Sequence, residues 1–120
     1  IVIILAISLF ALGCAKKFDT PQIADFDLKT FKVSSSKGVL LLYVQNSKNE
    51  YKFSLVNALG APEARRVLKD GSFKNLGFLP PNSAYNELFI KVLEMIKDEK
   101  NEQKFMIDDQ YYEVESVDLR

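Results

Sequence analysis

The sequence predicts an α+β protein in which a mostly antiparallel, curved sheet of about seven strands carries one amphipathic helix. Three observations lead to this prediction. Short segments with apolar residues at alternate positions recur along the chain, and turn-forming residues separate them. Segments that follow one another across such short turns pair as hairpins, which is typical of antiparallel sheets. One later segment, Ala84 to about Lys100, instead has the residue spacing of a helix.

Strands are expected in the first half of the domain. Residues 26–33 suggest a first strand, whose register the sequence leaves open, and the polar turn 34–38 follows it. The continuous apolar run 39–44 is typical of a strand buried on both faces. After a polar turn at 45–49, residues 51–55 alternate apolar and polar side chains, as expected for a strand with one buried face.

Further strands are expected on both sides of the helix. Gly60 and Pro62 mark a turn, and the residues from Ala64 to Leu68 and from Phe73 to Phe78 flank a Lys-Asp-Gly hairpin turn at 69–71. Beyond the helix, Phe105 and Ile107 alternate, Asp108-Asp109 forms a turn, and residues 111–117 form a last strand.

The helix has recognisable ends. Pro80-Pro81 ends the preceding strand, and Asn82 or Ser83 is a suitable N-cap. Glu87 lies near the start and Lys97 near the end, as the helix dipole favours. One apolar stripe, which we expect to pack on the sheet, comprises Tyr85, Leu88, Phe89, Val92, Leu93, Met95 and Ile96.

The N-terminal segment predicts export. The chain has 16 basic and 16 acidic residues, and none of them precedes Lys16. Residues 1–12 are apolar except for Ser8, and this run is shorter than the roughly 20 residues that span a bilayer. It matches the apolar region of a secretory signal. Neither a basic residue nor Met precedes it, so we expect a few upstream residues to complete the signal.

The end of this run resembles the bacterial lipobox. The residues Ala11-Leu12-Gly13-Cys14 carry the resemblance, which implies a diacylglyceryl thioether on Cys14 and cleavage before it. We therefore expect a signal peptide at 1–13, a lipidated N-terminus and tether at 14–24, and a single α+β domain at 25–120. The alternative, a core segment with a buried cysteine, does not explain both the charge-free start and the Gly-Cys junction.

The anchor also predicts a location. Each acyl carbon inserted into a membrane contributes about 0.8 kcal/mol, so two or three chains on Cys14 hold the protein there. Ala15 stands where many enteric lipoproteins retained in the inner membrane have Asp. We expect an outer-membrane lipoprotein that faces the periplasm.

The residue types disfavour an enzyme. The chain has no His, which excludes Ser-His and Cys-His catalysis and histidine metal sites, and its one Cys is assigned to lipid. The carboxylate pairs Asp108/Asp109 and Glu113/Glu115 and the Ser36-Lys37 pair are interpreted as turn and surface residues. We expect no cofactor and no metal. Net charge is zero, which argues against a nucleic-acid partner.

The order of elements resembles LolB-type outer-membrane lipoprotein receptors. Residues 51–55 followed by Asn57-Ala58-Leu59-Gly60-Ala61-Pro62-Glu63 resemble a strand and the Asn-x-Leu-Gly turn after it, and Glu87–Ile96 resembles the lid helix. Residues 105–111 resemble the return strand pair, so the resemblance covers about 39–117. It implies an incomplete barrel whose apolar cavity receives acylated lipoproteins from a periplasmic carrier.

Two functions remain open from these patterns. In the first, the helix covers a concave sheet and leaves an apolar cavity with the ligand-binding residues Leu59, Leu88, Phe89, Val92 and Met95. The protein would then bind an acyl chain or an acylated lipoprotein and help lipoprotein or lipid delivery to the outer membrane. In the second, the stripe is ordinary core, and the domain is a non-enzymatic interaction module that binds other envelope proteins by its sheet. A deep cavity under the helix favours the first, and a solid core favours the second.

Overall fold

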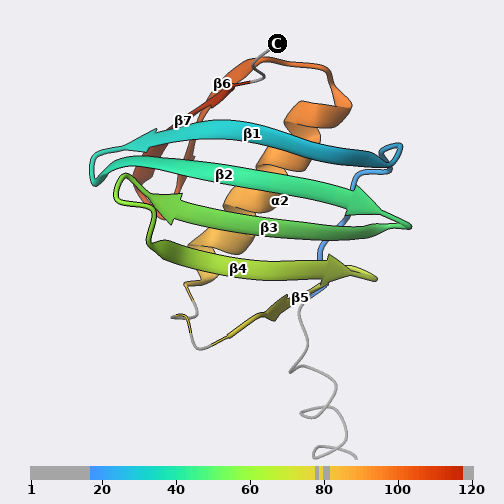
Figure 1. Ribbon diagram of the computed structural model, residues 1–120. Helices are drawn as coiled ribbons and strands as arrows, with labels where there is room; N and C mark the ends of the chain where they lie inside the picture. Colours follow the sequence, from blue (N-terminus) through green and yellow to red (C-terminus); the bar gives the residue numbers. More distant parts are fainter. Residues whose placement is uncertain (1–16, 78, 80–81, 118–120) are drawn as a thin grey trace, which may run out of the picture.

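Alternating apolar residues and short polar turns fold this chain into a sheet, and the computed structural model describes residues 17–77, 79 and 82–117. Among these residues, seven strands form one antiparallel sheet and one helix lies against one of its faces (Figure 1). The predicted α+β fold is confirmed. Cys14, the predicted signal segment 1–13 and residues 78, 80 and 81 lie outside the described part.

The sheet is a meander completed by a distant hairpin. Its strands are β1 (Phe26–Ser35), β2 (Gly38–Ser47), β3 (Glu50–Asn57), β4 (Pro62–Lys69), β5 (Ser72–Asn75), β6 (Glu102–Ile107) and β7 (Gln110–Ser116). Their order across the sheet is β5-β4-β3-β2-β1-β7-β6, with every neighbouring pair antiparallel. The helix α2 (Ser83–Lys97) follows β5 at one edge, and β6 and β7 return on the other side of β1.

Two-residue turns join four of the hairpins, and the turns after β2, β4 and β6 share one geometry. Both central residues of each have left-handed φ: Lys48 (54°) and Asn49 (63°), Asp70 (52°) and Gly71 (77°), and Asp108 (49°) and Asp109 (64°). Positive φ at both positions is the geometry of a type I′ turn, whose twist matches that of the paired strands. These turns fall within the predicted turn segments. In contrast, β5 ends at Asn75 rather than at the predicted Phe78, and Gly77 beyond it has a φ of 79°.

The helix begins where the sequence predicts. Asn82 is the N-cap, and its side-chain Oδ1 accepts a hydrogen bond of 2.9 Å from the backbone N–H of Ala84. The helix ends at Lys97, three residues before the expected end, because Glu99 takes a φ of 56°. The N–H of Lys100 then donates to the carbonyl of Met95 at 3.0 Å, which closes the C-terminus.

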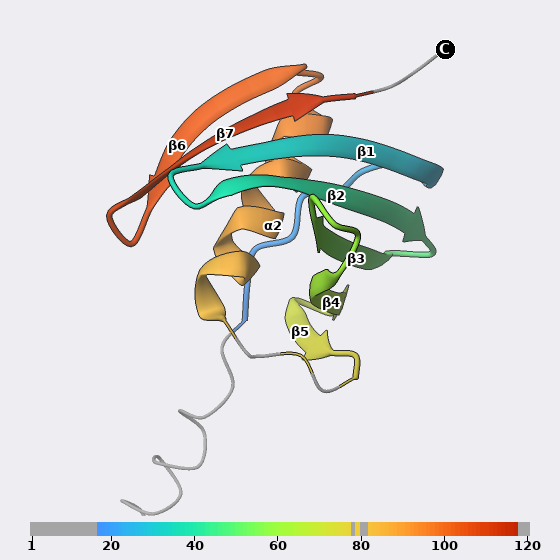
Figure 2. The same ribbon diagram turned by 60° about the vertical axis from the view of Figure 1, so that its left-hand side comes forward.

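The two faces of the sheet differ. On the face toward α2, Leu42 and Val44 have no exposed surface, and neighbouring strands add Phe53, Leu55 and Val114 to the same core. The prediction that the run 39–44 is buried on both faces is wrong. Val39 is 45% exposed and Leu41 and Tyr43 are half-buried, because none of the described elements covers the face opposite α2 (Figure 2).

Residues 17–24 lie against the domain on the same side as α2. The side-chain Nδ2 of Asn46 donates to the carbonyls of Ile23 (3.0 Å) and Ala24 (3.2 Å), and the Tyr51 hydroxyl donates to that of Pro21 (2.8 Å). The N–H of Phe18 donates to the carbonyl of Gly71 at 2.8 Å. Much of the segment expected as a tether is therefore held by β2, β3 and the β4–β5 turn.

Candidate functional site

The predicted ligand-binding residues of the helix belong to the buried core of the domain. Leu88, Phe89, Val92 and Met95 all have no exposed surface. The ring of Phe89 stacks on that of Phe53 of β3, with centroids 4.5 Å apart and an angle of 2° between the planes. The structure thus brings these four residues together against the sheet, where they pack as core residues do.

Leu59, the fifth predicted ligand-binding residue, lies on the surface. Its side chain is 93% exposed at the turn between β3 and β4. Asn57 fixes this turn, since its side-chain Oδ1 accepts hydrogen bonds from the N–H groups of Leu59 (2.9 Å) and Ala61 (3.0 Å). Gly60 supplies a φ of 85° between them. Leu59 is therefore held out into solvent, and it does not line a pocket with the helix residues.

Four hollows on the described surface have linings that differ from the predicted site. Four depressions have volumes of about 440, 350, 550 and 310 Å³, and none of them is lined by the five predicted ligand-binding residues. The hollow of about 550 Å³ lies at the C-terminal end of α2, where it combines apolar and charged side chains. Its lining includes Ile23, Phe26, Phe31, Ile96, Lys29 and Lys100.

The remaining candidate side chains occupy turns and strand surfaces. Asp108 and Asp109 are the exposed central residues of the β6–β7 turn. Glu113 lies opposite Lys104 on the neighbouring strand β6, and Glu115 lies opposite Lys32 on β1. The hydroxyl of Ser36 accepts a hydrogen bond of 2.8 Å from the side chain of Gln110. Within residues 17–77, 79 and 82–117 no group of three or more His, Cys, Asp or Glu could hold a metal ion.

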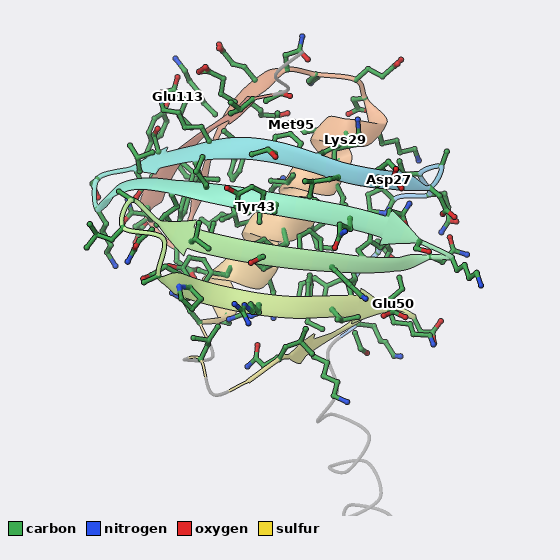
Figure 3. The ribbon with its side chains drawn as sticks, viewed as in Figure 1. Asp27, Lys29, Tyr43, Glu50, Met95 and Glu113 are labelled. Atoms are coloured by element: carbon green, nitrogen blue, oxygen red, sulfur yellow. The ribbon has the colours of Figure 1, made fainter. Side chains whose placement is uncertain are left out.

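The sheet face opposite α2 carries a continuous apolar patch. We call the residues Val39, Leu41, Tyr43 and Val56 the outer strip. The first three alternate along β2, and Val56 lies directly beside Leu41 on β3. Figure 3 shows Tyr43 on this face and Met95 on the helix behind the sheet.

Basic side chains flank the outer strip. Lys32 lies beside Leu41 on β1, and Lys52 and Arg65 lie on the neighbouring strands β3 and β4. Glu113 and Glu115 occupy the same face on β7, on the other side of β1. The strip is thus apolar at its centre, with positive charge on the side of β3 and β4.

Sequence reasoning did not identify two buried polar side chains, Asn46 and Arg66, which are 1% and 2% exposed. Asn46 holds residues 23 and 24, as described above. Arg66 alternates with Ala64 and Leu68 on the face of β4 toward the helix. That alternation is visible in the sequence, and it was the available signal for a buried cation.

Burial also changes the pKa of several groups. It lowers the pKa of Arg66 and raises the pKa values of Tyr51, Tyr85 and Tyr112. The physical cause is the same in each case, since loss of water disfavours the charged form. The negative charge of Asp25 raises the pKa of Tyr51 further, and that of Glu63 does the same for Tyr85.

In the part of the chain that the structure describes, no helix is both long and apolar enough to cross a membrane. Comparison with protein-family models, with curated proteins and with solved structures found no match.

Proposed function

We propose that this protein is a lipid-anchored, non-enzymatic module of the bacterial cell envelope that binds a partner protein through the outer strip. The observation that carries the proposal is the contrast between the two faces of the sheet. One face is filled by α2, whose inward residues have no exposed surface, while the other presents apolar side chains that no described element covers. Such patches are typical of interaction surfaces.

The charges around the strip suggest the chemistry of the partner. Lys52 and Arg65 lie on one side of the apolar side chains, and Glu113 and Glu115 lie on the other side beyond Lys32. A complementary surface therefore has an apolar centre with acidic residues where it meets β3 and β4. Lipid on Cys14 would keep the domain at the membrane, which raises the local concentration of envelope partners. Outer-membrane attachment facing the periplasm stays part of this proposal.

Site-specific crosslinking tests the surface. A photo-crosslinking residue is introduced at Tyr43 in the full lipidated chain, and the control carries it at Glu94, which is exposed on α2 on the other side of the sheet. Illumination of intact cells should give one discrete adduct from position 43 and none from position 94. Replacing Lys32 and Arg65 by Glu should reduce that adduct. Equal adducts from both positions, or none from position 43, would reject the outer strip.

A second candidate function is binding of an apolar chain, as the resemblance to LolB-type receptors implies. The hollow of about 550 Å³ at the C-terminal end of α2 favours it, because Ile23, Phe26 and Ile96 line it together with Lys29 and Lys100. Asp25 and Glu99 also line it, so its charges balance and its apolar side chains are what match an acyl chain. The acylated end of another lipoprotein is the corresponding natural ligand in delivery to the outer membrane.

Titration with a fluorescent fatty acid separates the two candidates. If an apolar chain binds in this hollow, Ile96→Glu should weaken binding at least tenfold, whereas the nearby exposed Glu94→Gln should not. If it binds under the middle of α2, Leu88→Trp should weaken it instead. Absence of saturable binding at micromolar protein would leave the interaction module as the better account.

A further inference from the structure

Arg66 places a positive charge in the core of the domain. It lies on β4 between Ala64 and Leu68, faces α2, and is 2% exposed. Taking a charge out of water is costly, and proteins normally offset this cost with a carboxylate or with a complete set of hydrogen bonds.

The partners of Arg66 leave this cost only partly offset. Its Nη1 donates a hydrogen bond of 2.6 Å to the side-chain Oδ1 of Asn86, near the start of α2. The ring centroids of Tyr85 and Phe89 lie 5.8 and 6.0 Å, respectively, from the guanidinium carbon. The other two donor atoms, Nε and Nη2, are buried and have no hydrogen-bond partner among the described residues. The ion pair found between described residues joins Lys91 to Glu94 on the helix surface, so it does not involve Arg66.

The two atoms without partners belong to one edge of the guanidinium group. Nε–H and one N–H of Nη2 point in the same direction, at a spacing that matches two oxygens of a carboxylate or a phosphate. Asn86 occupies Nη1 and so fixes the plane of the group. The structure therefore holds a bidentate donor in a defined orientation without its acceptor.

The position relative to α2 favours the same ligand chemistry. Tyr85, Asn86 and Phe89 all come from the first two turns of α2, whose N-terminus carries partial positive charge. The carboxylate on the same strand, Glu63, accepts a hydrogen bond of 3.5 Å from Nδ2 of Asn57, and its negative charge also reaches Tyr85. An acceptor brought by a ligand would thus meet two oriented donors beside the first two turns of α2.

We propose that Arg66 is the anchor of an oxyanion-binding site, which takes a carboxylate or phosphate group on its Nε/Nη2 edge. Asn86 is a positioning residue, because it orients the guanidinium without contacting the anion. Tyr85 is half-buried beside Arg66 and forms part of the cover, so the anion reaches the site when this side chain moves. The site is separate from the outer strip, which lies on the opposite face of the sheet, on β2 and β3.

Thermal unfolding of the full chain in detergent tests the site with three probes: inorganic phosphate, acetate and chloride at equal ionic strength. The variants are Arg66→Met and the matched control Arg65→Met, which removes the same charge from the exposed face of the same strand. Phosphate or acetate should raise the midpoint saturably, relative to chloride, for the unchanged protein and for Arg65→Met. The dissociation constant should increase at least tenfold in Arg66→Met.

Two further variants distinguish loss of anion binding from a general folding defect. Arg66→Lys keeps the charge but loses the bidentate edge, so it should also weaken the phosphate effect at least tenfold. Tyr85→Ala should leave the site open and bind phosphate at least as tightly as the unchanged protein. Equal shifts in the unchanged protein, Arg66→Met and Arg66→Lys would mean an adventitious ion only and would overturn the proposal, as would no shift with either oxyanion.

The source of the oxyanion can be distinguished with the same readout. Glycerol phosphate and dihexanoyl phosphatidylglycerol carry phosphate as a small solute and as a lipid headgroup. A shift with the first alone would identify a soluble ligand, and a shift with the second alone would identify a lipid. Neither shift should occur in Arg66→Met.

Discussion

At the scale of single residues, side-chain alternation predicted which face of the sheet or helix most residues occupy, but not which residues they contact. Ala64, Arg66 and Leu68 alternate in the sequence, so the inward position of Arg66 could be inferred. Its unpaired edge could not, because the residues near it, Tyr85, Asn86 and Phe89, come from a helix that follows later in the chain. In the same way, the helix stripe was predicted, while the complete burial of Phe89 within it depends on how closely β3 approaches the helix.

The stacked pair Phe53 and Phe89 provides a test of the packed core. Phe89→Ala removes a ring with no exposed surface, and we expect a loss of about 3–5 kcal/mol in the free energy of unfolding. Glu94→Ala, on the exposed side of the same helix, should change it by less than about 0.5 kcal/mol. Urea unfolding of both variants measures the difference. A small loss for Phe89→Ala would indicate that the space under α2 is not filled, and would favour the apolar-ligand function.

At the scale of elements, local signals predicted turns and the start of the helix better than the environment of strands. Asn82 as N-cap and the turns at 48–49, 70–71 and 108–109 follow from residues that are adjacent in the chain. The run 39–44 was misread because a continuous apolar segment does not reveal how many layers cover it. With one helix on one side, alternate residues of β2 became the outer strip.

The contact between residues 17–24 and the β4–β5 turn can be tested at Gly71. A Cβ at this position would lie 2.9 Å from the carbonyl oxygen of Phe18, and its φ of 77° disfavours other residues. Gly60 has a similar φ of 85° but nothing within 4 Å, so Gly60→Ala is the matched control for backbone strain. Both changes should destabilise the fold by roughly 1 kcal/mol.

Only Gly71→Ala should also release the N-terminal segment. The Phe18 N–H donates to the Gly71 carbonyl, so its hydrogen exchange should accelerate in Gly71→Ala and remain unchanged in Gly60→Ala. Equal exchange rates at Phe18 in the two variants would argue that this segment is not held by the turn.

At the scale of the whole molecule, the sheet order was the least accessible feature. The hairpins from β1 to β5 are local, and the sequence predicted them as a meander. The pairing of β1 with β7 joins opposite ends of the domain, with Val33 beside Val114, and no local pattern encodes it. This pairing makes the sheet continuous beside α2, so that one face of the sheet carries the buried core and no described element covers the opposite face (Figure 2).

The buried tyrosines predict how the stability of the whole fold depends on pH. Burial raises the pKa values of Tyr51, Tyr85 and Tyr112 above the ordinary value of 10.0. A phenol whose pKa is raised by folding contributes stability that is complete below about pH 10 and is lost as pH rises through the higher folded value. The free energy of unfolding should therefore fall above about pH 10.

Tyr51→Phe should make that fall shallower, although it also removes the hydrogen bond to Pro21. The control is Tyr111→Phe, since Tyr111 is 48% exposed on β7. Urea unfolding between neutral pH and pH 11 measures both slopes. Identical alkaline slopes for Tyr51→Phe and Tyr111→Phe would contradict the role given to burial.

The proposed lipid anchor remains a prediction from the sequence, because Cys14 lies outside the described residues. Its motivation is the charge-free run 1–12 followed by Gly13-Cys14. Mass spectrometry of the protein from its native membrane should find an acylated N-terminal Cys14 with no residue before it. Cys14→Ala should lose both the cleavage and firm membrane attachment, because two or three acyl chains supply the binding energy. If Cys14→Ala is still cleaved at the same bond and stays bound to the membrane after a salt wash, the attachment must come from the folded domain. The outer strip and Leu59 would then be the first surfaces to consider for it.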